Sequence, residues 1–186
     1  MAVEPEREPI EERLLILRSQ QGDPIAFRQL IERVDRRLLY FITTLINDSE
    51  QALDVSQETW LSVFRQLPKL SAPEAFRTWV YKIAHGKSIE LLRKRRQLSS
   101  TSELLKTPDT ADSESGTLRL ENIEFVHTAL SRLALSHREV LSLHFMENMS
   151  IENMAEVLNC PPGKVKSRLY YARAAMRRVI EELTSE

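Results

Sequence analysis

The chain of 186 residues is long enough for one domain or two small ones. Its 26 cations nearly balance its 27 acids, so net charge alone does not indicate a nucleic-acid partner. The single cysteine, Cys160, excludes an internal disulfide, and the four histidines lack metal-ligand spacing, so we expect no metal and no cofactor. Without a run of transmembrane length or a signal peptide, we expect a cytoplasmic protein with no membrane insertion.

The charges are strongly segregated along the chain. Residues 1–12 hold five acids and one arginine, a net charge of −4 (1 − 5). Residues 82–96 hold six cations and one acid, a net charge of +5, and residues 97–124 hold two cations and six acids, a net charge of −4. This pattern indicates two basic surfaces connected by acidic segments.

The first half of the chain has helical periodicity and no strand-like alternation. Asp23 and Pro24 form the N-cap and first position of a helix that ends at residues 47–49. The pattern predicts helices over residues 10–21, 24–46, 50–67 and 74–96, with a loop over 68–73. The expected core positions of the third helix are Ala52, Val55, Trp60, Leu61, Phe64 and Leu67.

The character of the sequence changes after the fourth predicted helix. Residues 97–117 are rich in Ser, Thr and Asp and lack aromatic residues, which is typical of a flexible linker. Two helices are then predicted over residues 122–133 and 136–147, with Ser136 and Glu139 as a capping box. We therefore expect an all-α protein with two helical domains, residues 1–96 and 118–186, joined by a linker over 97–117.

The most informative stretch covers residues 150–178, where a helix, a tight break and a basic helix follow one another. Ala155 is small enough to let two helices cross, and Asn159 tolerates the left-handed backbone of a turn. Pro161 and Pro162 break the first helix and set the entry of the second. This pattern predicts a helix-turn-helix.

The second helix of this motif is amphipathic and basic. Val165, Leu169, Ala172 and Met176 form one apolar stripe. Residues 163–178 contain six cations and no acid, which suits a helix in a DNA major groove between two rows of phosphates. Its charged and outward-facing positions are Lys164, Lys166, Ser167, Arg168, Tyr170, Tyr171, Arg173, Arg177 and Arg178.

The first bundle offers two further candidate surfaces. Asp54, Gln57 and Glu58 lie on the third predicted helix, where Asp54 and Glu58 share a face that, on its residues alone, is best interpreted as solvated. The fourth helix carries a basic end that favours phosphate contact or simply suits the helix dipole. Its cations are Lys82, Lys87, Arg93, Lys94, Arg95 and Arg96. For Trp60, Trp79 and Tyr81, core packing competes with base stacking and is favoured for both tryptophans.

In their order and separation, these segments resemble the RNA polymerase sigma factors of the extracytoplasmic-function (ECF) group. The resemblance is carried in the first half by G-D-P-I-A-F-R-Q-L-I-E-R (22–33), A-L-D-V-S-Q-E-T-W (52–60), F-R-T-W-V-Y-K-I-A (76–84) and L-L-R-K-R-R (91–96). In the second half it is carried by L-S-H-R-E-V-L-S-L (135–143) and M-A-E-V-L-N-C-P-P-G-K-V-K-S-R-L-Y-Y-A-R (154–173).

The resemblance implies a promoter-specificity subunit that is not an enzyme. Its first domain would bind core RNA polymerase through Asp54, Gln57 and Glu58 and would melt the −10 element. The resemblance places Lys82, Gly86, Lys87 and Arg93 at this DNA, with a flipped base held by the loop at residues 68–73. The second domain would read the −35 element, touch the polymerase flap and use His144 as a further phosphate contact. An anti-sigma protein is a further possible partner.

Four positions that depart from the family pattern bear on polymerase binding and DNA specificity. Leu53 replaces an acid of the polymerase-binding helix, and Gly86 replaces an asparagine of the base pocket. Lys164 replaces a threonine, and Tyr171 stands where a basic residue is common. The promoter preference of the family therefore cannot simply be transferred to this chain.

Two other function classes compete with this interpretation. A stand-alone helix-turn-helix regulator would bind duplex operators, but it would have no use for a strand-separating first domain. A nucleic-acid enzyme is disfavoured, because the sequence shows no paired carboxylates with metal-ligand spacing, no Cys/His dyad and no phosphate loop.

Overall fold

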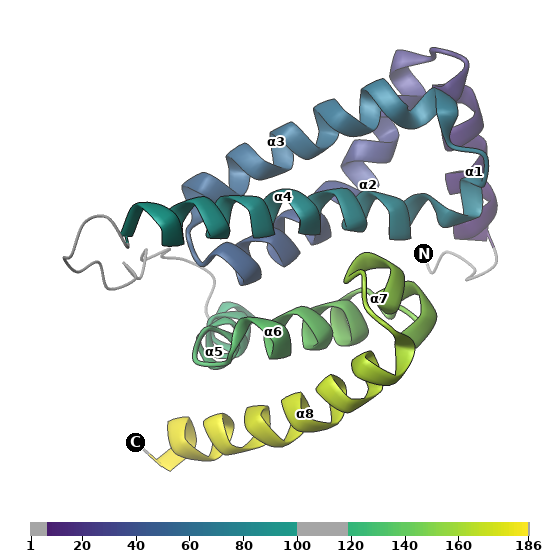
Figure 1. Ribbon diagram of the computed structural model, residues 1–186. Helices are drawn as coiled ribbons and strands as arrows, with labels where there is room; N and C mark the ends of the chain where they lie inside the picture. Colours follow the sequence, from purple (N-terminus) through teal and green to yellow (C-terminus); the bar gives the residue numbers. More distant parts are fainter. Residues whose placement is uncertain (1–6, 100–118, 186) are drawn as a thin grey trace.

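The computed structural model describes residues 7–99 and 119–185, and every regular element in these two ranges is helical. The expectation of an all-α protein with two helical regions is confirmed. Most of the predicted linker, residues 97–117, lies outside the described residues. Figure 1 shows the two regions, which we call the first bundle (α1–α4) and the second bundle (α5–α8).

Four helices and two short 3-10 turns make up the first bundle. Their bounds are α1 Arg7–Gln20, α2 Pro24–Ile46, α3 Ser49–Gln66, η1 Leu67–Lys69, η2 Pro73–Ala75 and α4 Phe76–Ser99. The predicted cap is confirmed, because Asp23 Oδ1 accepts hydrogen bonds from the backbone N–H groups of Ile25 and Ala26. Asn47 ends α2 in the left-handed conformation, and Asp48 then caps α3.

The second bundle consists of α5 Arg119–Ser131, α6 Leu135–Leu141, the π-helical turn η3 Ser142–Met146, α7 Ile151–Val157 and α8 Pro162–Ser185. The predicted helix over 136–147 is therefore an α-helix that changes to a π-helix. The predicted capping box is wrong. The N-cap of α6 is Ala134, which makes no side-chain hydrogen bond, and Glu139 instead faces His85 of α4.

The helix-turn-helix forms as expected between α7 and α8. Asn159 has φ of 47°, which is the left-handed conformation that the turn requires. The backbone N–H of Cys160 donates to the carbonyl of Ala155 and closes the turn. Pro162 is the first residue of α8, and Val165, Leu169 and Ala172 are buried against the rest of the bundle.

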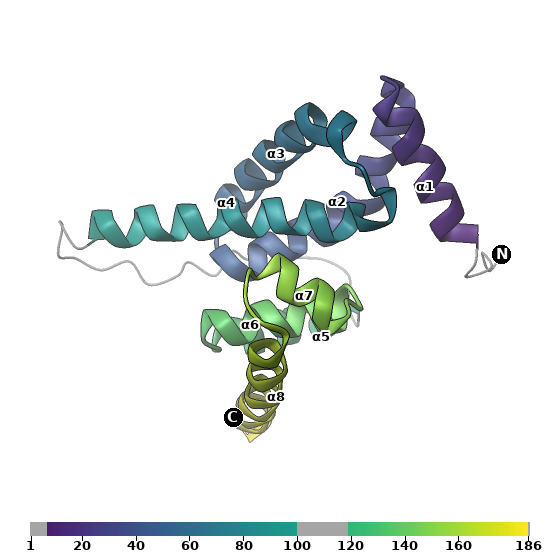
Figure 2. The same ribbon diagram turned by 45° about the vertical axis from the view of Figure 1, so that its right-hand side comes forward.

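The two bundles pack directly against each other. Helix α4 contacts α7, and α2 contacts α5, α6 and η3, so buried apolar side chains of both bundles belong to one continuous cluster. In both Figure 1 and Figure 2 the second bundle lies along α4, while α8 leads away from the first bundle. The sequence analysis predicted both bundles but not this docking.

Candidate functional site

The exposed face of α3 carries the three candidate polymerase-binding residues. Asp54, Gln57 and Glu58 are all exposed, as the sequence analysis expected. Their neighbours Leu61 and Phe64 are 55% and 62% exposed, so their assignment to the core is wrong. The core-facing stripe of α3 runs through Trp60 and Val63, and residues 61 and 64 lie one position past it.

The exposed leucines and phenylalanine change the character of this surface. Leu53 is 48% exposed, and together with Leu61 and Phe64 it places apolar area beside the carboxylates of Asp54 and Glu58. A mixed apolar and acidic helix face is suited to a protein partner with a basic rim. The sequence analysis misplaced Leu61 and Phe64 in the core. Each directly follows a core-facing residue, and apolar periodicity alone does not show where the buried face of a helix ends.

The aromatic residues of the first bundle serve its packing. Trp60 is buried, and its Nε1 donates a hydrogen bond of 2.7 Å to Asp35 Oδ1, which confirms the core assignment. Trp79 is half-buried beside Phe76, at 6.3 Å between ring centroids. Tyr81 is fully buried against Phe41, so in this arrangement it cannot stack on a base.

Helix α4 presents the candidate DNA-binding residues of the first bundle. Gly86 and Arg93 are exposed and line a shallow hollow with His85. Lys82 Nζ lies 3.4 Å from Glu156 of α7, and Lys87 Nζ lies 3.3 Å from Glu58 of α3. A Cβ built at Gly86 would meet nothing within 4 Å, so this position is open to a larger side chain.

The basic end of α4 is partly structural. Arg95 donates to the Asp48 carboxylate, the Gln51 side chain and the carbonyl of Ile46, which ties α4 to the turn between α2 and α3. Lys94 pairs with Glu90 at 2.8 Å, one helical turn away. Arg95 therefore has a stabilising role that composition could not separate from phosphate binding.

The loop before α4 is held by a residue that sequence analysis did not identify. The predicted loop at residues 68–73 begins within η1 and ends at η2. Gln20 of α1 reaches across, and its Nε2 donates to the carbonyls of Leu67 and Leu70 at 3.1 and 2.7 Å. These contacts fix the loop on the first bundle, and no local pattern links residues so far apart in sequence.

The recognition face of α8 is open. Tyr170 and Tyr171 are 72% and 61% exposed, and their rings meet edge to face at 5.4 Å. Lys164, Lys166 and Ser167 are exposed on the first two turns of the same helix. An exposed face with cations, hydroxyls and no acid can contact both phosphates and base edges.

Three further DNA candidates already have partners within the second bundle. Arg168 Nη1 lies 3.8 Å from Glu139 Oε2. Arg173 Nη2 lies 2.9 Å from His144 Nε2, and its guanidinium sits 5.4 Å from the centre of the Phe145 ring. These side chains lie near the recognition face, but DNA would have to compete for them.

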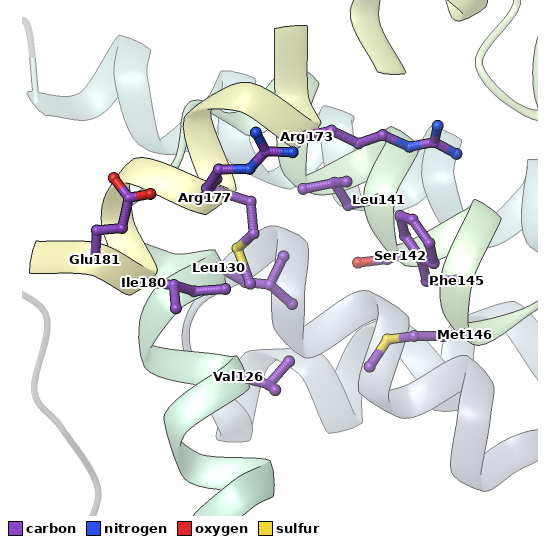
Figure 3. Close-up of a pocket in the computed structure, with 11 residues that line it drawn as sticks. Val126, Leu130, Leu141, Ser142, Phe145, Met146, Arg173, Arg177, Ile180 and Glu181 are labelled. Carbon is purple, nitrogen blue, oxygen red and sulfur yellow. The ribbon is translucent and has the colours of Figure 1, made fainter. Parts of the chain in front are cut away.

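An apolar groove of about 620 Å³ runs between α5, η3 and α8. Figure 3 shows Leu130, Phe145 and Ile180 on its walls, with Arg173 and Arg177 on the α8 side. Leu141, Met146, Met176 and Val126 complete the apolar lining. The groove lies on the second bundle and involves none of the α4 residues.

A partly buried carboxylate lies where the bundles meet. Glu147 follows η3 and is placed near Tyr81, Arg77 and Arg37 of the first bundle. Burial raises the pKa of Glu147, partly offset by Tyr81 and the two arginines. Burial and the nearby carboxylate likewise raise the pKa of Tyr81. Among the described residues, the Tyr81 hydroxyl and Glu147 Oε1 lie close to each other without reaching full hydrogen-bond geometry to any group.

Comparison with known families matches each bundle to a separate family. Residues 30–97 match the family Sigma-70 region 2, and residues 125–176 match Sigma-70, region 4. No helix within the described ranges is long and apolar enough to cross a membrane.

The curated relatives align along almost the whole chain. RNA polymerase sigma-H factor of Pseudomonas aeruginosa is 30% identical over 185 residues, covering 92% of this chain and 95% of the relative. ECF RNA polymerase sigma-E factor of Escherichia coli is 26% identical over 187 residues, covering 95% and 97%. ECF RNA polymerase sigma factor SigW of Bacillus subtilis is 24% identical over 175 residues, covering 88% and 94%.

Solved structures share the fold. CnrH, solved in complex with the cytosolic domain of CnrY, is 25% identical with a TM-score of 0.68, covering 92% of this chain and 98% of CnrH. The sigma factor RpoE from Bartonella quintana, solved with the anti-sigma factor NepR, has a TM-score of 0.71 at 23% identity, covering 83% and 96%. With both sigma regions present in order, the chain belongs to the ECF group of RNA polymerase sigma factors, the promoter-specificity subunits that direct core polymerase to a subset of promoters.

Proposed function

We propose that the two bundles divide the work of promoter recognition. The first domain, residues 1–96, binds core RNA polymerase and opens the −10 element, and the second, residues 118–186, reads the −35 element as duplex DNA. Residues 97–117 connect the two. The observation that carries this proposal is the separation of two exposed surfaces, an acidic and apolar face on α3 and a basic, acid-free face on α8.

The polymerase contact is assigned to α3. Asp54 and Glu58 supply charge, Gln57 supplies hydrogen bonds, and the exposed Leu61 and Phe64 supply apolar area. The resemblance to the family implies an acid where this chain has Leu53, so this contact relies more on apolar burial than on charge. Burying one leucine side chain contributes about 2 kcal/mol, which is more than an exposed ion pair provides.

The −35 contact is assigned to α8. Lys164 and Lys166 bind phosphates on either side of the groove, while Ser167, Tyr170 and Tyr171 face the base edges. Arg168, Arg173 and His144 lie beside this face and join the phosphate contacts once DNA displaces their present partners.

The −10 contact is assigned to α4 and the loop that precedes it. Gly86 and Arg93 line an exposed hollow, and Lys82 and Lys87 flank it with their ammonium groups. The loop is anchored by Gln20, so it can receive an unstacked base without a large cost of ordering.

Two protein partners fit the remaining surfaces. The apolar groove on the second bundle can receive a segment of the polymerase flap. An anti-sigma protein is a further partner, since CnrH and RpoE were both solved with a protein partner.

Reconstitution with core RNA polymerase tests the proposal. The parent should open promoter DNA, measured as permanganate-reactive thymines, only with core polymerase present. Asp54→Lys and Glu58→Lys should weaken binding to core polymerase, whereas Glu32→Lys, an exposed acid on α2 with the same charge change, should not. Equal binding by all three variants would remove α3 from the interface. Duplex binding without any effect of core polymerase would instead favour a stand-alone regulator.

A further inference from the structure

The π-helical turn η3 places two aromatic rings against one arginine of α8. His144 and Phe145 both belong to this turn, and their rings meet edge to face at 4.8 Å. Arg173 Nη2 lies 2.9 Å from His144 Nε2, and the guanidinium lies 5.4 Å from the centre of the Phe145 ring. Figure 3 shows Arg173 extending from α8 towards the side of the groove where Phe145 lies. The π-turn thus gives Arg173 two partners, an imidazole and an aromatic ring.

Arg173 lies beside the recognition face of α8. It follows Tyr170 by three residues, which places the two side chains on neighbouring turns of one helix face. Tyr170 is 72% exposed and belongs to the surface assigned to the −35 element. A guanidinium at this place can bind the DNA backbone next to that surface. Its contact with His144 therefore decides whether it is available to a phosphate.

This contact fixes the protonation state of His144. A guanidinium has only N–H donors and stays charged in proteins, so His144 Nε2 must accept the hydrogen bond from Arg173. An accepting Nε2 requires a neutral imidazole with its proton on Nδ1. In a protonated imidazole Nε2 is itself a donor, and it would face both a donor and a like charge. The contact between His144 and Arg173 therefore exists only while His144 is neutral.

The neutral imidazole is not fully satisfied in this contact. His144 Nδ1 is buried and has no hydrogen-bond partner among the described residues. Because Nδ1 carries the proton of the neutral ring, a buried N–H stays unpaired, and this costs free energy. Once Arg173 leaves, the half-buried ring can turn towards solvent and regain that hydrogen bond. The contact is therefore weak enough for a proton or a phosphate to replace it.

No carboxylate stabilises a charged His144. Within the described ranges, Arg173 is the charged side chain that contacts it, and no acid forms an ion pair with it. Helices α2, α6 and α7 pack on η3, and α5 and α8 line the groove with it. Their charged and titratable side chains have other neighbours: Glu139 faces His85 and Arg168, Glu156 faces Lys82, Glu147 lies near Tyr81, Arg77 and Arg37, Arg138 lies near Glu139 and His127, His127 packs on Tyr40, and Arg177 and Glu181 line the groove beyond Arg173. The anion that can stabilise a charged His144 is then a DNA phosphate.

We propose that duplex binding by α8 is linked to protonation of His144: the neutral imidazole holds Arg173 on η3, and a proton on His144 releases Arg173, so that both cations bind phosphates beside the −35 surface. This inference rests on the proposed function, because it concerns when Arg173 and His144 join the phosphate contacts assigned there. The chain should bind duplex DNA more tightly as pH falls through the range in which histidines titrate, because DNA then meets two additional free cations.

The first test measures the duplex affinity of the full chain at about pH 5.5 and about pH 8, with a mixed-sequence duplex as the probe. Arg173→Ala should weaken binding less than about twofold at the higher pH, where a phosphate must replace His144, and about fivefold at the lower pH, where Arg173 is free. Lys164→Ala, at an exposed position of the same helix, should weaken binding by the same factor at both pH values. An equal effect of Arg173→Ala at both pH values overturns the inference.

Variants of His144 separate its role as an acceptor from its charge. His144→Gln keeps an acceptor that cannot be protonated, so Arg173→Ala in this background should have the small effect at both pH values. His144→Leu keeps a bulky side chain without an acceptor, so Arg173→Ala should weaken binding about fivefold at both. An effect of Arg173→Ala that still depends on pH in the His144→Gln background overturns the inference. This outcome can be read even if His144→Leu fails to fold.

Proton uptake is a second measurement, which a purely structural role of His144 would not change. Isothermal titration calorimetry of duplex binding at about pH 6.5, in two buffers of different ionisation enthalpy, counts the protons bound together with DNA. The parent should take up about half a proton more per complex than His144→Gln. His137→Gln, which changes a half-buried histidine of α6 with no assigned DNA contact, should behave as the parent does. Equal uptake by the parent and His144→Gln overturns the inference.

Failure of this inference is distinguishable from failure of the proposed function. If Lys164→Ala weakens duplex binding but Arg173→Ala acts equally at both pH values, only the link to His144 is wrong. If Lys164→Ala leaves duplex binding unchanged at both pH values, the assignment of the −35 element to α8 is wrong, and the link to His144 falls with it.

Discussion

The two basic helices of this sigma factor hold their cations differently. On α4, Lys82, Lys87 and Lys94 each face a carboxylate of the same chain within 3.4 Å. On α8, Lys164 and Lys166 are exposed and form no ion pair within the described ranges. Two stretches of similar composition thus differ in how readily a phosphate can reach them.

The difference originates in the neighbouring helices. Helices α3 and α7 present Glu58 and Glu156 to Lys87 and Lys82 of α4, whereas among the described residues no neighbouring helix presents a carboxylate to Lys164 or Lys166 at the start of α8. A basic sequence therefore predicts a positive electrostatic potential, but it does not predict whether the cations are free to bind phosphates or already paired with carboxylates. For α4, DNA binding includes the cost of breaking existing pairs, and for the start of α8 it does not.

The largest expected effect concerns stability. Arg77 of α4 donates from Nε and Nη2 to Glu12, a residue that is 9% exposed. Arg77→Ala leaves this carboxylate buried without its cation and should lower the free energy of unfolding by about 2 kcal/mol, measured by urea denaturation. Lys166→Ala, the matched control on α8, should change it by less than about 0.5 kcal/mol. If both variants lost similar free energy of unfolding, the cations of α4 would not be more involved in the fold than those of α8.

The second prediction concerns salt dependence of duplex binding. Lys164→Ala and Lys166→Ala should each weaken binding for all sequences by about 1 kcal/mol and reduce the slope of log affinity against log salt by about 0.9. Arg28→Ala, an exposed cation on α2, controls for the change in net charge and should leave the slope unchanged. An unchanged slope in both lysine variants would place the phosphates elsewhere.

The third prediction concerns base preference at Gly86, in the proposed base pocket of α4. Gly86→Asn adds an amide where space is free, and one new hydrogen bond to a base contributes about 0.5–1.5 kcal/mol. Preference at one −10 position should therefore increase a few-fold in transcription from single-base promoter variants, with −35 preference unchanged. Gly86→Ala, which adds no amide, is the control. If Asn and Ala behave alike, the pocket is not at Gly86.

Local features of the fold were predictable from the sequence because their causes are local. Asp23 with Pro24 fixed the start of α2, and Asn159 fixed the helix-turn-helix turn. The exposure of Lys164 and Tyr171 followed from the apolar stripe on the opposite side of α8. Of the candidate site, the exposure of this α8 face was predicted best; its role in DNA recognition stays a prediction.

Features that depend on distant partners were not predictable. Glu139 was expected to cap its own helix, yet it faces His85, which is 54 residues away in sequence. Leu61 was placed in the core, but it is exposed. The apolar residues of a single helix do not reveal how much of its surface neighbouring helices will bury. The role of Gln20 in anchoring the loop before α4 was not predictable either, because the carbonyl that it contacts belongs to Leu70, 50 residues away in sequence.

The smallest expected effect concerns pH and the contact between the bundles. Burial raises the pKa of Glu147 above its usual value of 4.5 in the native state, so the native protein retains a proton that the unfolded chain has already lost. The contribution of Glu147 to stability should therefore decrease as pH rises from about 4.5 through the raised pKa, and remain constant above it. Glu147→Gln cannot ionise and should escape this loss.

The melting temperatures of parent and Glu147→Gln, measured from pH 4 upward, should therefore separate in favour of the variant as pH rises, and then differ by a constant amount. Glu181→Gln, an exposed carboxylate on α8, should follow the parent throughout. The comparison is informative because Glu147 faces Arg77 and Tyr81 across the bundle interface. If the bundles were not in contact, Glu147 would be hydrated and the two curves would run parallel at every pH.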